Sequence, residues 1–252
     1  MNVNWQNIAV AVASKVQYEL ACGRGRLLTE QVTRLALAEV IQSQVIGKLL
    51  PEYNHPDLAG NKQLDLVVMS PRDKKISVAI ELKWVRKTTD NTTRLWMEEI
   101  VGDVLRLERL SANLKTKAER AVVVVGEADV LNSKVWDRKI NPGKKQNRAR
   151  VIGNLVPGKS QFKDGEAEVS PTVVDLKKEG AVYQNFIRNA VPDIFNELPS
   201  SYIINMSAYH RTMQDGIECI VWTVSRPVGR RNTFSGTKLW GTQNKTNNLE
   251  DF

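Results

Sequence analysis

The sequence predicts an α/β fold in which a mixed β-sheet is flanked by helices. Two helical segments precede a short apolar hairpin, and a long amphipathic helix follows it. The next segment, Ala121–Val125, is almost wholly apolar, which is typical of a strand covered on both faces. The order helix, hairpin, helix, buried strand indicates a sheet between helices.

The first fifty residues are expected to form two helices. Residues 4–21 have helical character, and Gly23 and Gly25 end that segment. The second helix begins at Thr29, a plausible N-cap, and carries apolar residues at helical spacing. Pro51 ends this helix at the latest, because proline has no backbone N–H to continue it.

The middle of the chain predicts a hairpin and a helix. Leu64–Met69 reads as a short apolar strand that the turn residues Ser70–Asp73 end. Ile76–Trp84 is rich in β-formers and pairs with it as a hairpin. A long helix follows over roughly Asn91–Leu114, with apolar residues near one face.

The C-terminal part is less regular. Residues 137–170 are polar and aperiodic and indicate an extended loop, whereas 181–197 are helical with an interruption at Pro192. Tyr202–His210 and Ile217–Ser225 predict a second hairpin.

A chain of 252 residues can bury one large core. We expect residues 1–136 to hold the N-terminal helices and the core. Residues 137–252 are expected to add the basic loop and an extension with a helix and a β-hairpin, continuing the same domain.

The charge of the chain favours a polyanionic partner. Its formal net charge is +8 and its pI is near 9.5. The segment Asp137–Arg150 concentrates basic residues, and we interpret four of them as candidate contacts to nucleic-acid phosphates: Lys144, Lys145, Arg148 and Arg150.

The location expected for the chain is cytoplasmic. No stretch approaches the roughly 18 apolar residues of a membrane span, and the first residues lack the features of a signal peptide. Cys22 and Cys219 lie far apart in the sequence, which suits free thiols in a reducing compartment.

Charged residues interrupt both strands of the first hairpin. Asp65 lies in the first strand and Glu81 in the second. Because residues two apart on a strand share a face, Glu81 and Lys83 project together, and Leu82 points to the opposite layer with its carbonyl near the carboxylates. Two carboxylates suffice to anchor Mg²⁺, which can activate water for phosphodiester hydrolysis. Lys83 could orient or deprotonate that water, or neutralise charge on the phosphate.

This pattern resembles the PD-(D/E)XK nuclease superfamily: Asp65 followed by Leu-Val-Val, then Glu81-Leu82-Lys83 at the end of an apolar strand. The resemblance covers roughly residues 27–127 and implies a restriction-endonuclease-like core with the order α-β-β-α-β. It implies that Asp65 and Glu81 bind Mg²⁺ or Mn²⁺, with Leu82 beside the metal, and that Lys83 assists catalysis.

Many members of the superfamily add a glutamate from the preceding helix. Glu30 matches that feature best, and Glu39 is the fallback. The superfamily's proline directly before the aspartate is replaced by Leu64. The upstream pair Pro56-Asp57 competes for the role, but no apolar strand follows it.

The function expected from the resemblance is a Mg²⁺-dependent endonuclease that cleaves DNA, of a restriction, defence or mobile-element type. The alternative is a catalytically silent nucleic-acid-binding or assembly module with the same fold. A homodimer would suit cleavage of both strands of a duplex, although no segment specifies an interface.

Three other signals favour structural roles. Gly153–Ser160 matches the P-loop pattern but lacks the apolar strand before it and the helix after it. His210 is expected to have a structural or surface position rather than a catalytic role. On the long helix, Glu98, Glu99 and Asp103 are expected to form a solvated face, with Arg106 within reach of a phosphate.

Overall fold

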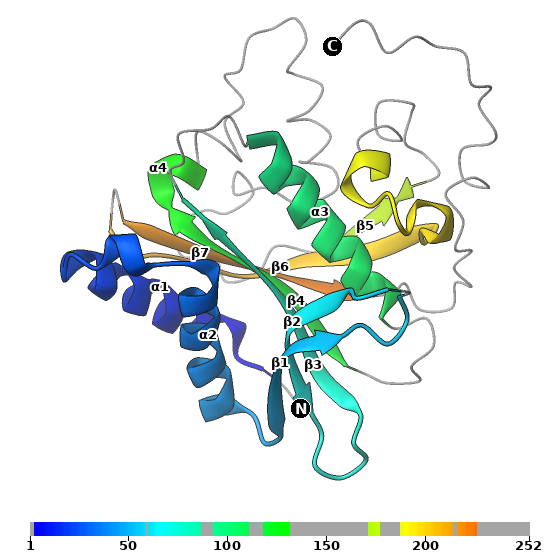
Figure 1. The fold of residues 1–252 in the computed structure, drawn as a ribbon, viewed down its shortest axis with the longest axis horizontal. Coiled ribbons are helices and arrows are strands. Elements are labelled where there is room, and N and C mark those ends of the chain that lie inside the picture. Colours follow the sequence, from blue (N-terminus) through cyan, green and yellow to red (C-terminus); the bar gives the residue numbers. More distant parts are fainter. Residues whose placement is uncertain are drawn as a thin grey trace, which may run out of the picture.

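The structure, a computed structural model, describes residues 3–58, 60–86, 93–110, 118–131, 171–176, 187–213 and 216–225. These residues form an α/β arrangement, a seven-stranded mixed sheet with helices against both faces (Figure 1). None of the described helices combines the length and apolar character that a membrane crossing requires.

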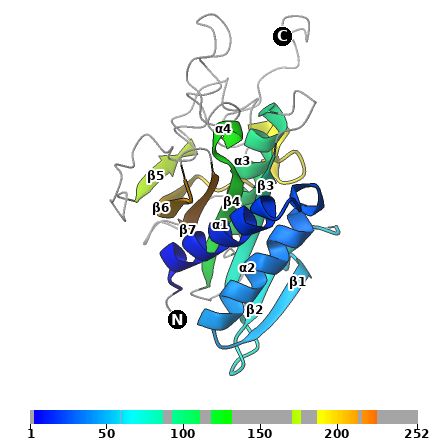
Figure 2. The same ribbon diagram turned by 90° about the vertical axis from the view of Figure 1, so that its left-hand side faces the viewer.

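Helices α1 (Trp5–Ala21) and α2 (Glu30–Gln44) lie together on one face of the sheet (Figure 2). Each begins at a side-chain cap, because Asn4 and Thr29 each accept a hydrogen bond from the backbone N–H three residues further on. The short 3₁₀ helix η1 (Gly25–Leu27) joins them.

The strands follow one another in the order β1-β2-β3-β4-β7-β6-β5. Only the neighbours β3 and β4 are parallel, and the other pairs are antiparallel. Their bounds are β1 Lys48–Asn54, β2 Gln63–Met69, β3 Ile76–Val85, β4 Glu119–Glu127, β5 Thr172–Asp175, β6 Ser201–Arg211 and β7 Ile217–Ser225.

Two apolar cores sandwich the sheet. Helix α3 (Thr93–Arg109) packs on the face opposite α1 and α2 and shares its core with Ala79 and Val85 of β3. The alternate residues of β3, including Ile80 and Leu82, belong to the core under α1 and α2. Two short elements complete the described fold, α4 (Ala128–Val130) and η5 (Phe195–Glu197).

The long regular elements confirm the sequence predictions. The first helix, the Thr29 cap and the antiparallel hairpin of β2 and β3 are present as expected. The apolar run of β4 is buried on both faces, and β6 and β7 form the second hairpin.

The second helix ends at Gln44, within the limit that Pro51 set. Pro51 itself lies within β1, a strand that was not predicted. A proline is tolerated there because β1 is an edge strand of the sheet. Gly47 permits the close entry into β1, since a Cβ at this position would lie 2.6 Å from the Met69 carbonyl oxygen.

The remaining differences concern the order of elements and the C-terminal half. The predicted order α-β-β-α-β lacks β1, and β5 was not expected. The second hairpin is built into the sheet, since β7 pairs with β4. Helix α3 ends at Arg109, and around Pro192 only residues 187–190 and η5 are helical among those described.

Candidate functional site

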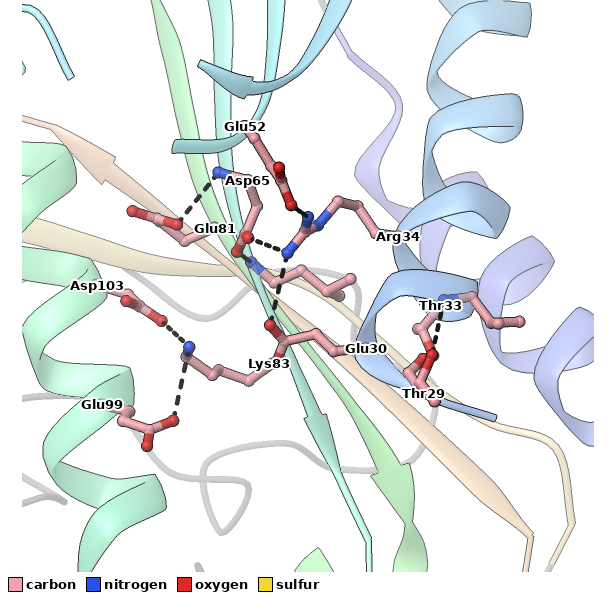
Figure 3. Close-up of polar contacts among 12 residues, drawn as sticks. Thr29, Glu30, Thr33, Arg34, Glu52, Asp65, Glu81, Lys83, Glu99 and Asp103 are labelled. Carbon is pink, nitrogen blue, oxygen red and sulfur yellow. Dashed lines mark hydrogen bonds and ion pairs between the residues drawn. The ribbon is translucent and has the colours of Figure 1, made fainter. Parts of the chain in front are cut away.

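The two carboxylates predicted for the site lie close together at the point where the pairing between β2 and β3 ends (Figure 3). The strand pairing reaches Leu66 and Ile80 and stops before Asp65 and Glu81. Beyond that point, side-chain carboxylates accept the hydrogen bonds between the strands. The Asp65 N–H donates to Glu81 Oε2 at 3.4 Å, and the Leu82 N–H donates to Asp65 Oδ2 at 2.7 Å. The carboxylates therefore converge, each fixed by the backbone of the other strand.

Alternation along β3 orients the three consecutive residues as expected. The side chain of Leu82 is fully buried in the core under α1 and α2. Glu81 and Lys83 project to the other face, where both make ion pairs with α3. The backbone of Leu82 thus borders both carboxylates while its side chain anchors the strand.

Arg34 of α2 organises what we call the outer half of the site, which comprises Arg34, Glu30, Glu52 and Asp65. Its Nη2 lies 2.6 Å from Asp65 Oδ1 and 3.7 Å from Glu30 Oε1. Its Nη1 lies 2.8 Å from Glu52 Oε1. Glu30, in the first turn of α2, therefore belongs to the site, whereas the fallback Glu39 pairs with Lys15 on α1.

Lys83 and Arg106 organise the inner half, which comprises these two residues with Glu81, Glu99 and Asp103. Lys83 Nζ lies 3.6 Å from both Glu99 Oε2 and Asp103 Oδ2. Arg106 pairs with Asp103 and lies 3.5 Å, through Nε, from Glu81 Oε1.

The expectation that Asp103 lies on a solvated face was wrong, because its side chain is 0% exposed. Glu99 is half exposed, yet it also contacts Lys83. One signal could have revealed Asp103: it lies among Ile100 and Val104, which form the buried face of α3.

Burial dominates the electrostatics of the inner half. Burial first, and then the charge of Asp103, raises the pKa of Glu81 well above its usual range. Burial likewise raises the pKa of Asp103 to about 6, although Arg106 and Lys83 oppose that shift. Both carboxyl groups thus bind protons more readily than exposed acids do.

The charge state of Lys83 limits its chemistry. Burial lowers its pKa, but the carboxylates of Asp103, Glu30 and Glu99 outweigh burial and raise the pKa above the ordinary lysine value. The ammonium group therefore stays protonated at neutral pH. Of the roles open to Lys83, orienting a ligand or neutralising negative charge suits this state, and accepting a proton does not.

His55 ties the loop after β1 to the inner half. Its Nδ1 accepts a hydrogen bond from the Asp57 N–H at 3.2 Å, so its Nε2, 3.0 Å from the Arg106 carbonyl oxygen, is the donor. Burial lowers the pKa of His55, consistent with this neutral tautomer. Asp57, the competitor for the aspartate role, thus serves this connection.

The donor set suits a hard divalent cation in chemistry and charge. Six carboxylates against three cations give the fully ionised cluster a formal charge of −3. Carboxylate oxygens are the ligands that Mg²⁺ prefers. Among the described residues, however, no group of three or more His, Cys, Asp or Glu is arranged around a point that could hold a metal ion. Arg34 and Arg106 lie on the oxygens instead.

The predicted phosphate contacts Lys144, Lys145, Arg148 and Arg150 lie outside the described residues, as does the P-loop-like segment Gly153–Ser160. His210, expected at a structural or surface position, lies on β6 opposite Cys219 of β7. No family model, no curated protein and no solved structure matches the chain.

Proposed function

We propose that the protein is a Mg²⁺- or Mn²⁺-dependent endonuclease that hydrolyses phosphodiester bonds in DNA, of a restriction, defence or mobile-element type, on a restriction-endonuclease-like core. The observation that carries this proposal is the convergence of Asp65 and Glu81 where the pairing of β2 and β3 ends, with Lys83 on the same face. Helix α2 before the hairpin, and α3 and β4 after it, support the proposed core.

Asp65 and Glu81 would hold the cation, with the Leu82 carbonyl as a further oxygen donor and Glu30 as support from α2. These residues come from two strands and a helix that are each anchored in a core, so the donors are held by rigid elements. A bound Mg²⁺ supplies Lewis acidity and lowers the pKa of a coordinated water.

Lys83 acts by charge in this proposal. Its protonated amine, held between Asp103 and Glu99, is suited to stabilise negative charge that develops on the phosphate. The net charge of +8 supports a polyanionic substrate, and the basic residues 144–150 are proposed to contact its backbone.

One observation favours the alternative, a catalytically silent nucleic-acid-binding or assembly module. The arginines pair with carboxylates within the protein, and a cluster of ion pairs of this kind can be purely structural. The two functions differ in whether Lys83 and the carboxylates are needed for turnover or only for folding.

Cleavage of supercoiled plasmid by the purified protein tests the proposal. Reactions would contain Mg²⁺, Mn²⁺ or EDTA, and the variants would be Lys83→Ala and the matched control Lys75→Ala, an exposed lysine in the β2–β3 turn. The proposal expects metal-dependent nicking or linearisation that Lys83→Ala loses and Lys75→Ala retains. Salt-sensitive DNA binding without cleavage would favour the silent module.

A further inference from the structure

Arg34 is held by three carboxylates from three different elements. Glu30 belongs to its own helix, Glu52 to β1 and Asp65 to β2. The Arg34 side chain is only 14% exposed, and its two Nη atoms hold Glu52 and Asp65 at once. A planar guanidinium can bridge two carboxylates in this way, and a lysine ammonium cannot reproduce the fork.

The position of Arg34 on Asp65 matters because the two oxygens of that carboxylate differ. Oδ2 accepts the Leu82 N–H and is fixed by β3. Oδ1 is the oxygen that lies against Arg34. The oxygen best placed to face a bound cation is therefore the one that a protein cation already holds.

Glu52 is an unusual anchor for that guanidinium. Its backbone φ of 51° lies in the left-handed region, which a glutamate rarely adopts. The flanking β1–β2 pairs, Pro51 with Leu66 and Tyr53 with Leu64, place Glu52 opposite Asp65 where the pairing is interrupted. The Glu52 side chain is 56% exposed, so it holds Arg34 from the solvent side of Asp65.

We propose that the Arg34 guanidinium is the resident counter-ion of Asp65, which a divalent cation must displace, and that Glu52 and Glu30 retain Arg34 at the rim of the site afterwards. This inference rests on the proposed function, because it concerns the same cation. Arg34 and the cation compete for one carboxylate, so each weakens binding of the other by the same factor. The displaced guanidinium, still tethered to Glu52, is placed to contact a substrate phosphate.

The test is calorimetric titration of Mn²⁺ into wild-type protein, Arg34→Gln, Asp65→Asn and the double variant, without DNA. Arg72→Gln is the matched control, since it removes the same charge from the exposed turn at the far end of the β2–β3 hairpin. We expect Arg34→Gln to bind Mn²⁺ roughly fivefold to a hundredfold more tightly than wild type, the usual range for coupled sites. Arg72→Gln should bind like wild type, and Asp65→Asn should abolish binding in either background.

Two outcomes would overturn the inference, and they can be told apart. Asp65-dependent binding of equal strength in wild type and Arg34→Gln would support the metal site. It would exclude Arg34 as a competitor of the cation for Asp65. No Asp65-dependent binding in either protein would exclude both the competition and the proposed metal site. Should Arg34→Gln not fold, Arg34→Lys is the second variant, because it keeps the positive charge but cannot bridge Glu52 and Asp65. Its Mn²⁺ affinity should still rise above that of wild type.

Discussion

The outer and inner halves of the site contain the same kinds of ion pair in different surroundings. In the outer half, the Arg34 and Asp65 side chains are largely buried, but Glu52 is more than half exposed and Glu30 is partly exposed, so water and salt reach the pairs that Arg34 makes with these two glutamates. In the inner half, Asp103 and Glu81 are almost completely buried beneath α3. Exposed ion pairs can exchange partners at low cost. A buried charge, in contrast, destabilises the fold when any one of its partners is removed.

This difference assigns distinct tasks to the two halves. The inner half fixes the geometry and charge of Glu81 and Lys83, and the raised pKa values of Glu81 and Asp103 reflect carboxylates crowded together out of water. The outer half supplies the replaceable cation, Arg34. A binding site needs ligands that rigid neighbours hold in place, and the inner half supplies such neighbours.

The largest effect expected concerns the rate of DNA cleavage, compared between a variant of Glu81 in the inner half and a variant of Glu30 in the outer half. Glu81→Gln should lower metal-dependent DNA cleavage by about a thousandfold, because it removes a proposed ligand of the cation that activates the water. Glu30→Gln should lower cleavage by only about tenfold, since Glu30 supports the site from outside. Initial rates on a labelled duplex would measure both, with circular dichroism to confirm folding. Equal losses would show that Glu30 is needed for cleavage as much as Glu81 is.

The second effect concerns stability. Arg106→Gln should lower the free energy of unfolding by about 3 kcal/mol, because it leaves the carboxylates of Glu81 and Asp103 buried without their guanidinium partner. Arg34→Gln should lower it less, by about 1 kcal/mol, since two of its three partners, Glu30 and Glu52, are well solvated and only Asp65 is largely buried. Urea denaturation without divalent cations compares the two. A larger loss for Arg34→Gln would contradict the assignment of outer and inner halves.

The third effect is a pH dependence of the inner half. The folded-state pKa of Asp103, about 6, lies above its unfolded value, so the folded protein takes up a proton as the pH falls and gains stability. The variant Asp103→Asn cannot do so, because its amide does not titrate. Between pH 7 and pH 5 the wild type should therefore gain about 1 kcal/mol relative to Asp103→Asn. Urea denaturation at both pH values measures this difference, and a difference independent of pH would rule out titration of Asp103 in this window.

The smallest effect concerns the helix that carries Glu30 and Arg34. The Thr29 hydroxyl accepts the Val32 N–H, so Thr29→Ala should lower stability by about 1 kcal/mol, and Thr29→Ser should retain most of it. Thermal unfolding of the two variants provides the measurement. Identical melting temperatures for Thr29→Ala and wild type would show that the cap does not stabilise α2.

Periodicity and local capping predicted the regular part of the fold. The cap at Thr29, the apolar strand β4 and the two hairpins depend on short-range patterns that a sequence displays directly. Strand β1 was missed because its exposed residues and Pro51 carry no such pattern. An edge strand is defined by the neighbour with which it pairs rather than by its own composition.

Local patterns likewise predicted some residues of the candidate site and missed others. Asp65, Glu81 and Lys83 were predicted because alternation on a strand places side chains on known faces. Glu52 was missed with the strand that carries it, and Asp103 was assigned to solvent because a charged residue on an amphipathic helix is usually exposed. The pairing of Arg34 with Asp65 depends on how α2 packs across β2, a long-range contact that no local pattern encodes.

The nuclease assignment is tested most directly by incubating DNA with wild-type protein and with Asp65→Asn in a titration of Mn²⁺. We expect cleavage by the wild type that rises with Mn²⁺ and disappears with EDTA. We expect none by Asp65→Asn, which keeps the shape of the side chain but loses its charge. Cleavage by Asp65→Asn at the wild-type rate would exclude Asp65 as a metal ligand, and a folded, DNA-binding wild type that never cleaves would exclude the proposed nuclease.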